Sequence, residues 1–190
     1  MTKVAIWCRH KEDNIIGIGS DIPWRIPSDL RRFRHLTKGK TIVAGKNTYE
    51  SFPNRTLPER RILVVANEKN YEVSDPQNHF AVDDLKLLEK YAEDLYIAGG
   101  ASIYKACFTT ENLMPDVVVD SVYQGDIAAT FTGTPVTVSA CVEILKQKYM
   151  PLEPSYELDN VKTTVWIKKG EFVDQSVVKA ICKYLETEGK

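Results

Sequence analysis

The chain has 190 residues, of which 43% are hydrophobic and 27% charged, and its formal net charge is −1. This composition is typical of a globular protein with a sizeable core, and the charge balance gives no reason to expect nucleic acid or a membrane surface as a partner. The length predicts one domain with a short appendage.

The cysteines and the N-terminal segment indicate a cellular compartment. Four cysteines are widely spaced, at positions 8, 107, 141 and 182, and none forms a C-x-x-C pair. This pattern favours reduced thiols over a disulfide framework, and we expect no metal site. The N-terminal segment has no long apolar stretch, so we expect no secretory signal and a cytoplasmic protein.

Short apolar runs alternate with helical patterns along the chain. The spacing predicts strands at 4–8, 40–45, 60–67, 79–82, 95–100 and 116–123, and helices at 27–36, 47–52, 83–91 and 101–108. Segments 141–150 and 162–169 have the pattern of a late antiparallel pair of strands. We therefore expect an α/β fold with a central, twisted, mainly parallel sheet, antiparallel C-terminal strands and flanking helices.

The last part of the chain has a different pattern. Apolar residues recur at helical spacing from Val173 to Tyr184, after Gly170. We divide the chain into a domain at 1–169 and an amphipathic helical extension at 170–190. Such a helix either covers the core or binds a partner, and we favour docking on the domain, because most amphipathic helices cover core.

Two predicted strands end on glycine where a helix begins. Gly45 is followed by Lys46, Asn47 and Thr48, and the second site reads Gly99-Gly100-Ala101-Ser102. Free N–H groups at a helix start bind phosphate, and glycine lets a ligand approach the backbone. Neither sequence is a complete phosphate-binding fingerprint, and each alone is more often an ordinary turn. Two such turns at neighbouring strand ends favour a dinucleotide with donors on both sides of its diphosphate.

Asp29 lies in the first turn of the predicted helix at 27–36, after a stiff apolar approach that contains Trp24. An acidic residue there often only complements the helix dipole. In apolar surroundings, however, desolvation raises the pKa of a carboxyl, which can then donate a proton or hydrogen-bond an amidine-like ring edge. Leu30 and Phe33 lie on or beside the same helix face.

A basic pair, Arg60 and Arg61, precedes the predicted strand at 60–67. An arginine in such a position can bind a carboxylate through two hydrogen bonds. The ordinary alternative is a solvated charge pair at the rim of the fold.

Together these features resemble the dihydrofolate reductase family. The matching segments are IIGIGSDIPWRIPSDLRRF, TIVAGKNTYESFPNRTLPERRILVVAN and YIAGGASIY, in the family's order and at about its spacing. The resemblance covers roughly residues 4–169. It implies NADPH-dependent reduction of 7,8-dihydrofolate to tetrahydrofolate, binding of antifolate-type inhibitors, and a monomer or weak homodimer.

The resemblance also assigns roles by position. The catalytic group would be Asp29, with Trp24 ordering a water and Ile22 in a loop that closes over the nicotinamide. The substrate pocket would comprise Trp7, Cys8, Leu30, Phe33, Phe52, Leu57, Arg60, Ala98, Tyr104 and Asp120. The cofactor would contact Ile16, Gly45, Lys46, Asn47, Thr48, Ala66, Asn67, Gly99, Gly100, Ala101 and Ser102.

Several positions depart from the family pattern, among them Glu59, which replaces a turn glycine, and three others that bear on the site. Asp120 occupies the place of a threonine that hydrogen-bonds the catalytic acid, although a one-residue shift would turn Ser121 inward instead. Arg9 replaces a small residue after the first strand. Asn67 stands where an arginine often binds the 2′-phosphate, which leaves Lys46 and Lys69 as candidate phosphate partners.

Two other interpretations remain open. One is a different pterin or pyrimidine reductase of the same fold, and the other is a binding or structural protein on this scaffold. Asp29 in its Trp-Pro context and Arg60 favour the folate reductase over the first. Asp120, Arg9 and the added tail support the second, but a catalytically inactive relative is expected to have lost Asp29 or the glycines, which are present.

Overall fold

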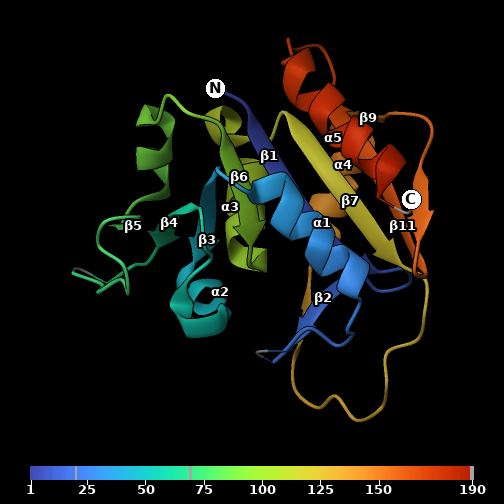
Figure 1. Ribbon diagram of the computed structural model, residues 1–190, viewed down its shortest axis with the longest axis horizontal. Helices are drawn as coiled ribbons and strands as arrows, with labels where there is room; N and C mark the ends of the chain where they lie inside the picture. The colour runs from blue at the N-terminus through green and yellow to red at the C-terminus, as the bar shows by residue number, and fades with distance from the viewer. Residues whose placement is uncertain (20, 69, 189–190) are drawn as a thin grey trace.

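The computed structural model describes residues 1–19, 21–68 and 70–188 (Figure 1). The strands are β1 Lys3–His10, β2 Ile15–Ile18, β3 Thr41–Gly45, β4 Arg61–Val65, β5 His79–Val82, β6 Leu95–Gly99, β7 Val117–Tyr123, β8 Pro135–Thr137, β9 Tyr149–Pro151, β10 Tyr156–Leu158 and β11 Val161–Lys168. The α-helices are α1 Pro27–Thr37, α2 Lys46–Ser51, α3 Ala101–Thr109, α4 Ser139–Lys148 and α5 Gln175–Thr187, with short 3-10 turns η1 Pro53–Arg55, η2 Leu85–Lys90 and η3 Glu111–Leu113.

Within the described residues, nine strands form one sheet in the order β10-β11-β7-β1-β6-β3-β4-β5, with β9 also paired to β11. The pairs from β7 to β5 are parallel, and β11 runs antiparallel to β7, β9 and β10. The expected mainly parallel sheet with antiparallel C-terminal strands is confirmed. Strands β2 and β8 form a separate antiparallel pair.

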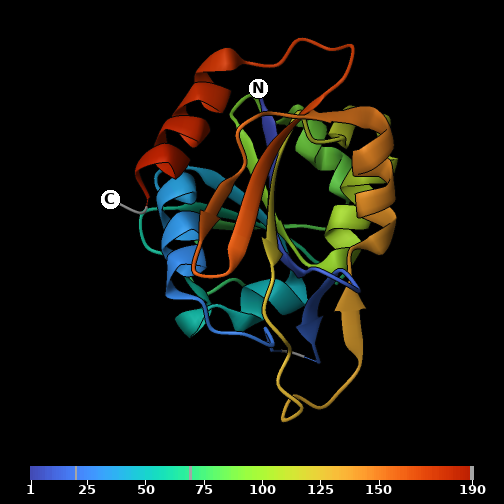
Figure 2. The ribbon, with the colours of Figure 1, turned by 90° about the vertical axis from the view of Figure 1, so that its right-hand side faces the viewer.

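Helices cover both faces of this sheet, with α1 and α5 on one side and α3 and α4 on the other (Figure 2). Side chains of β1 alternate between two cores, because successive residues of a strand point to opposite faces. Ala5 and Trp7 belong to the core beneath α3 and α4, whereas Val4 and Ile6 belong to the core beneath α1 and α5. The sheet therefore separates the surroundings of α1 from those of α3.

The prediction of a strand at residues 141–150 is wrong. Segment 141–150, taken for a strand, forms most of helix α4, and only its end joins the short strand β9. Cys141, Val142 and Leu145 are buried, at positions i, i+1 and i+4. That spacing belongs to a helix packed on the sheet, which the short window did not distinguish from a buried strand.

The tail docks on the domain, as expected. Helix α5 packs against the core beneath α1 through Val177, Val178, Ile181 and Leu185. The turn before it contains Gly170 with φ +76°, a conformation that favours glycine. In the described ranges, no helix combines the length and the apolar character needed to cross a bilayer.

Candidate active site

The two glycine-bearing strand ends lie side by side. Strands β3 and β6 pair in parallel, with Ala44 opposite Gly99. Helix α2 begins directly after β3, and α3 begins one residue after β6. Neither helix start has a hydrogen bond from a capping side chain. The first-turn N–H groups of two helices therefore meet at one edge of the sheet, as the sequence predicts.

Glycine is required at this edge because the backbone is crowded. A Cβ atom on Gly45 would lie 2.9 Å from Cγ1 of Ile103. Gly99 has φ +106°, and a Cβ there would lie 2.9 Å from the ring of Tyr104. That ring is held in place, because the Tyr104 hydroxyl donates a hydrogen bond to the carbonyl oxygen of Ile6. Glycine at these two positions thus lets the strand ends pack directly against side chains of α3.

Gly99→Ala should destabilise the folded protein by about 2–4 kcal/mol, because it combines a strained backbone with displacement of Tyr104. Urea unfolding followed by circular dichroism measures this loss. Gly39→Ala is the matched control: Gly39 also has a positive φ, of +70°, but no atom lies within 4 Å of an added Cβ. Equal losses in both variants would contradict the role assigned to Tyr104.

Asp29 occupies the first turn of α1, where Pro27 begins the helix. Its side chain is 22% exposed. The buried stripe of α1 is formed by Ser28, Arg32 and Leu36, which are four residues apart. Asp29 therefore lies at the margin of the buried face, next to Leu30, which is 55% exposed.

The Asp29 carboxyl is surrounded by opposing electrostatic effects. Burial raises its pKa, the Arg32 guanidinium lowers it and the Glu188 carboxylate raises it, with a net result of about 6 compared with an ordinary 3.8. Arg32 Nη1 lies 3.3 Å from Oδ1 of Asp29. The carboxyl can therefore hold a proton closer to neutral pH than an ordinary aspartic acid does.

This raised pKa makes Asp29 costly to the fold at neutral pH. The folded protein binds this proton more tightly than the unfolded chain, so the contribution of Asp29 to stability is greatest below pH 4 and falls as the pH rises towards about 6. Asp29→Asn should therefore stabilise the protein by about 1–3 kcal/mol at pH 8 and have little effect at pH 4. Chemical denaturation at the two pH values measures the difference, and equal effects at both would contradict the raised pKa.

Ser121, not Asp120, faces Asp29. Ser121 lies on the same face of the sheet as Arg32, which donates a hydrogen bond to its hydroxyl over 3.2 Å. Asp120 points to the opposite face, where Trp7 Nε1 and Arg9 donate hydrogen bonds to it. The expectation that Asp120 lines the pocket is therefore wrong. The register of β1 and β7 is unbroken, so strand alternation alone turns Ser121 inward.

The other expected pocket residues come from several elements. Cys8 of β1 pairs with Ser121 of β7 in the parallel register, and burial, followed by the Asp29 carboxylate, raises the pKa of its thiol. Phe33 packs against the core beneath α1, and Phe52 and Leu57 pack around Tyr49. Trp7 points away, into the core beneath α3, so that only its backbone can face the site.

Two side chains in the approach to α1 differ in exposure. Ile22 is 56% exposed, as expected of a residue in a surface loop. Trp24 is half-buried and packs against Tyr123 with ring centroids 5.2 Å apart. Its indole N–H is buried without a hydrogen-bond partner among the described residues. A buried donor of this kind is normally satisfied by water or a ligand.

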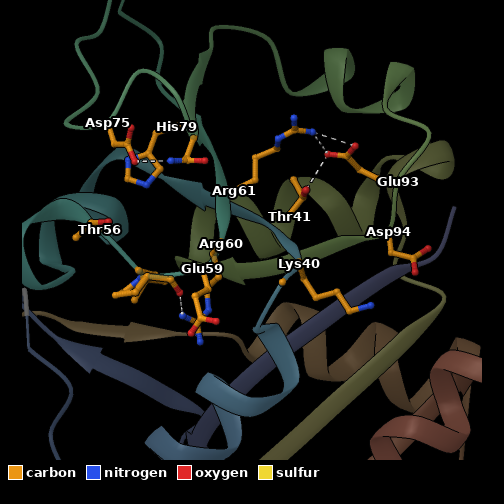
Figure 3. A pocket seen from close by; sticks show the side chains of 14 residues that line it. Lys40, Thr41, Thr56, Glu59, Arg60, Arg61, Asp75, His79, Glu93 and Asp94 are labelled. Atoms are coloured by element: carbon orange, nitrogen blue, oxygen red, sulfur yellow. Dashed lines mark hydrogen bonds and ion pairs between the residues drawn. The ribbon is translucent and has the colours of Figure 1, made fainter.

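Arg60 is held rigidly and is 8% exposed. Its guanidinium donates hydrogen bonds to the Thr37 hydroxyl and to the backbone carbonyls of Pro58 and Arg34. Burial and the neighbouring Arg34 guanidinium lower its pKa, so an anion is favourable here. Arg60 borders a hollow of about 620 Å³, into which its neighbour Arg61 projects to pair with Glu93 (Figure 3).

The residues predicted to contact the cofactor differ in their exposure and in the contacts they make near the glycine-bearing ends of β3 and β6. Thr48 is adjacent to Gly100, where an added Cβ would lie 3.1 Å from its hydroxyl. Lys46 pairs with Glu68. Asn67 is exposed and Ala66 is buried, after β4. Asn47 and Ser102 are exposed, and Ile16, Ala98 and Ala101 are half-buried. Lys69 lies outside the described residues.

The sequence analysis did not single out Arg32 or Thr37. Arg32 is 1% exposed and contacts Asp29, Ser121 and Glu188. Thr37 at the end of α1 orients Arg60. The helical periodicity of α1 is the one pattern that indicates a buried Arg32, because Arg32 lies four residues from both Ser28 and Leu36 on the buried stripe.

Comparison with known proteins agrees with this geometry. A family model described as dihydrofolate reductase matches residues 3–135. The dihydrofolate reductase of Enterococcus faecium is 32% identical over 132 residues, which cover 68% of this chain and 77% of that protein. The dihydrofolate reductase of Neisseria gonorrhoeae is 32% identical over 126 residues, or 66% of this chain and 78% of that protein.

A solved structure shares the fold. Dihydrofolate reductase from Enterococcus faecalis, complexed with NADP(H) and RAB-propyl, superposes with a TM-score of 0.70 at 20% identity, covering 88% of this chain and 96% of that one. The sequence matches, the sheet order and the Asp29 site lead to the same conclusion: this chain belongs to the dihydrofolate reductase family.

Proposed function

We propose that this protein catalyses the NADPH-dependent reduction of 7,8-dihydrofolate to 5,6,7,8-tetrahydrofolate. The observation that carries the proposal is the Asp29 carboxyl, whose pKa is raised to about 6 in the first turn of α1. A reductase of an imine bond needs a proton source near neutral pH, and the largely buried Asp29 carboxyl meets this requirement.

The glycine edge fits a dinucleotide cofactor. Gly45 and Gly99 let the ends of β3 and β6 pack closely against α3, and the uncapped starts of α2 and α3 leave N–H donors beside these strand ends. Thr48 and Ser102 would add hydroxyl donors, and Lys46 would add positive charge. NADPH, when bound, supplies the hydride. Asn67 is uncharged, so Lys46 is the described cation best placed for the cofactor's phosphates.

Asp29 would bind and protonate the substrate. Its carboxylate would accept hydrogen bonds from the amino group and ring N–H of the pterin, and in its protonated form it supports protonation of N5. Ser121 is uncharged and accepts a hydrogen bond from Arg32. The pKa of Asp29 is therefore set by burial, the Arg32 guanidinium and the Glu188 carboxylate. Trp24, with its unpartnered indole N–H, would order a water beside the pterin.

The remaining pocket residues would position the substrate. Leu30 and Phe33 would provide apolar walls from α1, and Phe52 and Leu57, which pack around Tyr49, would provide further apolar surface. Arg60, fixed by Thr37 and two carbonyls, would bind the glutamate carboxylate of dihydrofolate. Antifolates that mimic the pterin should occupy the same site.

The same geometry bears on assembly and location. All the residues of the proposed site come from one chain, so a monomer would suffice for activity. The four cysteines are free thiols, which fits the reducing cytoplasm.

Purified protein should oxidise NADPH only when dihydrofolate is added, and NADH should support a slower reaction. Absorbance of the reduced nicotinamide measures this directly, between pH 5 and pH 9. Turnover should fall as the pH rises above about 6, because Asp29 loses its proton there. Tight binding of both ligands without oxidation would contradict catalysis and favour a binding protein.

A further inference from the structure

The end of helix α5 reaches the active site. Glu188 directly follows α5, and its Oε2 accepts a hydrogen bond from Arg32 Nε over 2.8 Å. The other end of the same guanidinium contacts Asp29 and Ser121. The Glu188 side chain is 4% exposed and that of Arg32 is 2% exposed. A buried arginine is therefore shared between two carboxyl groups, one of which is the proposed catalytic acid.

Helix α5 is anchored so that Glu188 cannot easily move away. Asp174 caps its start by accepting a hydrogen bond from the backbone N–H of Ser176. Ile181 and Leu185 are buried in the core beneath α1. Tyr184 stacks on His35 of α1 with ring centroids 3.9 Å apart. The family match ends at residue 135, so this anchoring belongs to a part of the chain outside it.

The position of Glu188 opposes two general preferences. A negative charge at the C-terminal end of a helix is unfavourable, because the helix dipole is negative there. Burial of a carboxylate is also costly without a partner. Both costs are offset by the direct contact with Arg32, and Glu188 Oε1 has no further partner among the described residues. The pairing with Arg32 thus accounts for the position of Glu188.

We propose that Glu188 is a positioning residue of the active site, which shares the Arg32 guanidinium with Asp29 and leaves the Asp29 carboxyl available to hold a proton and bind substrate. The proposal rests on the proposed function of Asp29. Without Glu188, Arg32 would have Asp29 as its one anionic partner, and a full ion pair would hold Asp29 ionised. The C-terminal helix would then complete the active site rather than merely cover the core.

The groups that face Asp29 support this division of charge. They are Arg32 on its own helix, Glu188 after α5 and Cys8 on β1. Tyr104 of α3 lies in the core on the other face of the sheet, and its pKa is raised by burial and, to smaller extents, by Cys141 and Asp29. Arg32 is the cation of this set, and Glu188 is the second anion in direct contact with it. A change at Glu188 should therefore reach Asp29 through Arg32.

Three variants test this coupling, and the two single variants should shift the titration midpoint of Asp29 in opposite directions. Glu188→Gln keeps a neutral acceptor for Arg32 and should lower the titration midpoint of Asp29 by about one pH unit. Arg32→Gln leaves Glu188 as an uncompensated neighbour and should raise the midpoint. The double variant should return the midpoint towards that of the unchanged protein. Nuclear magnetic resonance of the Asp29 carboxyl carbon in the protein without ligands measures all three.

Activity provides a second, separate measurement. In Glu188→Gln, turnover at pH 7.5 should fall about tenfold while the KM for dihydrofolate changes less, because a smaller fraction of Asp29 is protonated. Glu186→Gln is the matched control, since Glu186 carries the same charge two residues earlier, within α5, but is exposed. Its midpoint and turnover should equal those of the unchanged protein.

Several results would overturn the inference. One is an unchanged Asp29 midpoint in folded Glu188→Gln, as judged by circular dichroism. If that variant does not fold, Arg32→Gln must still titrate at a higher pH than the double variant, and equal midpoints would reject the coupling. If the protein reduces no dihydrofolate, the proposed function fails, but the titration in the ligand-free protein still tests the Glu188 contact.

Discussion

Asp29→Asn should lower kcat/KM for dihydrofolate about a thousandfold at pH 7 and leave NADPH binding within a factor of two. The loss follows from the removal of a positioned proton source, which contributes about 10²–10⁴ to a rate. Cofactor binding should be spared, because the glycines proposed to contact the cofactor end β3 and β6, whereas Asp29 lies on α1. Steady-state kinetics and quenching of protein fluorescence by NADPH measure the two effects.

The pH dependence sharpens this test. In the unchanged protein, activity should fall as the pH rises through the Asp29 pKa of about 6. In the asparagine variant this inflection should disappear, and the residual rate should increase only at low pH, where the substrate arrives already protonated. Asp83→Asn, at an exposed position after β5, is the control for loss of one negative charge. Unchanged turnover of Asp29→Asn at pH 7 would refute the role of Asp29.

Arg60→Lys should raise the KM for dihydrofolate on the order of 10²-fold and change kcat less than about threefold. A lysine keeps the charge but loses the planar fork that binds a carboxylate through two hydrogen bonds. The binding energy concerned is remote from the reacting bond, so its loss appears mainly in KM. Kinetics with dihydrofolate and with dihydropteroate, which lacks the glutamate, separate the contact from general damage.

A matched control is available at the next position. Arg61→Lys changes an exposed arginine that pairs with Glu93 on the side of the neighbouring hollow (Figure 3). It should leave both kinetic constants unchanged. In Arg60→Lys, the KM for dihydropteroate should equal that of the unchanged protein. An equal rise for both substrates would show that Arg60 supports the fold of the pocket rather than the glutamate carboxylate.

Local patterns in the sequence determined most of the architecture. Apolar runs bounded by glycine predicted the parallel strands, because a strand buried on both faces must be apolar along its length. Pro27 followed by Asp29 marked the start of α1, since both residues suit the first turn of a helix. The pattern was insufficient at 141–148, where a short apolar repeat fits a strand as well as the helix that forms.

Tertiary structure alone decided the electrostatics of the site. Which of Asp120 and Ser121 faces Asp29 depends on the register between β1 and β7, which no single strand contains. The burial of Arg32 depends on α5, which begins 143 residues after it (175 minus 32) and places Glu188 against its guanidinium. Charges interact through space, so their balance is set by distances that exist only after the chain has folded. The sequence by itself therefore pointed to Asp29 as the candidate acid and to the glycines that end β3 and β6, and the assembled fold decided the electrostatic surroundings of that acid.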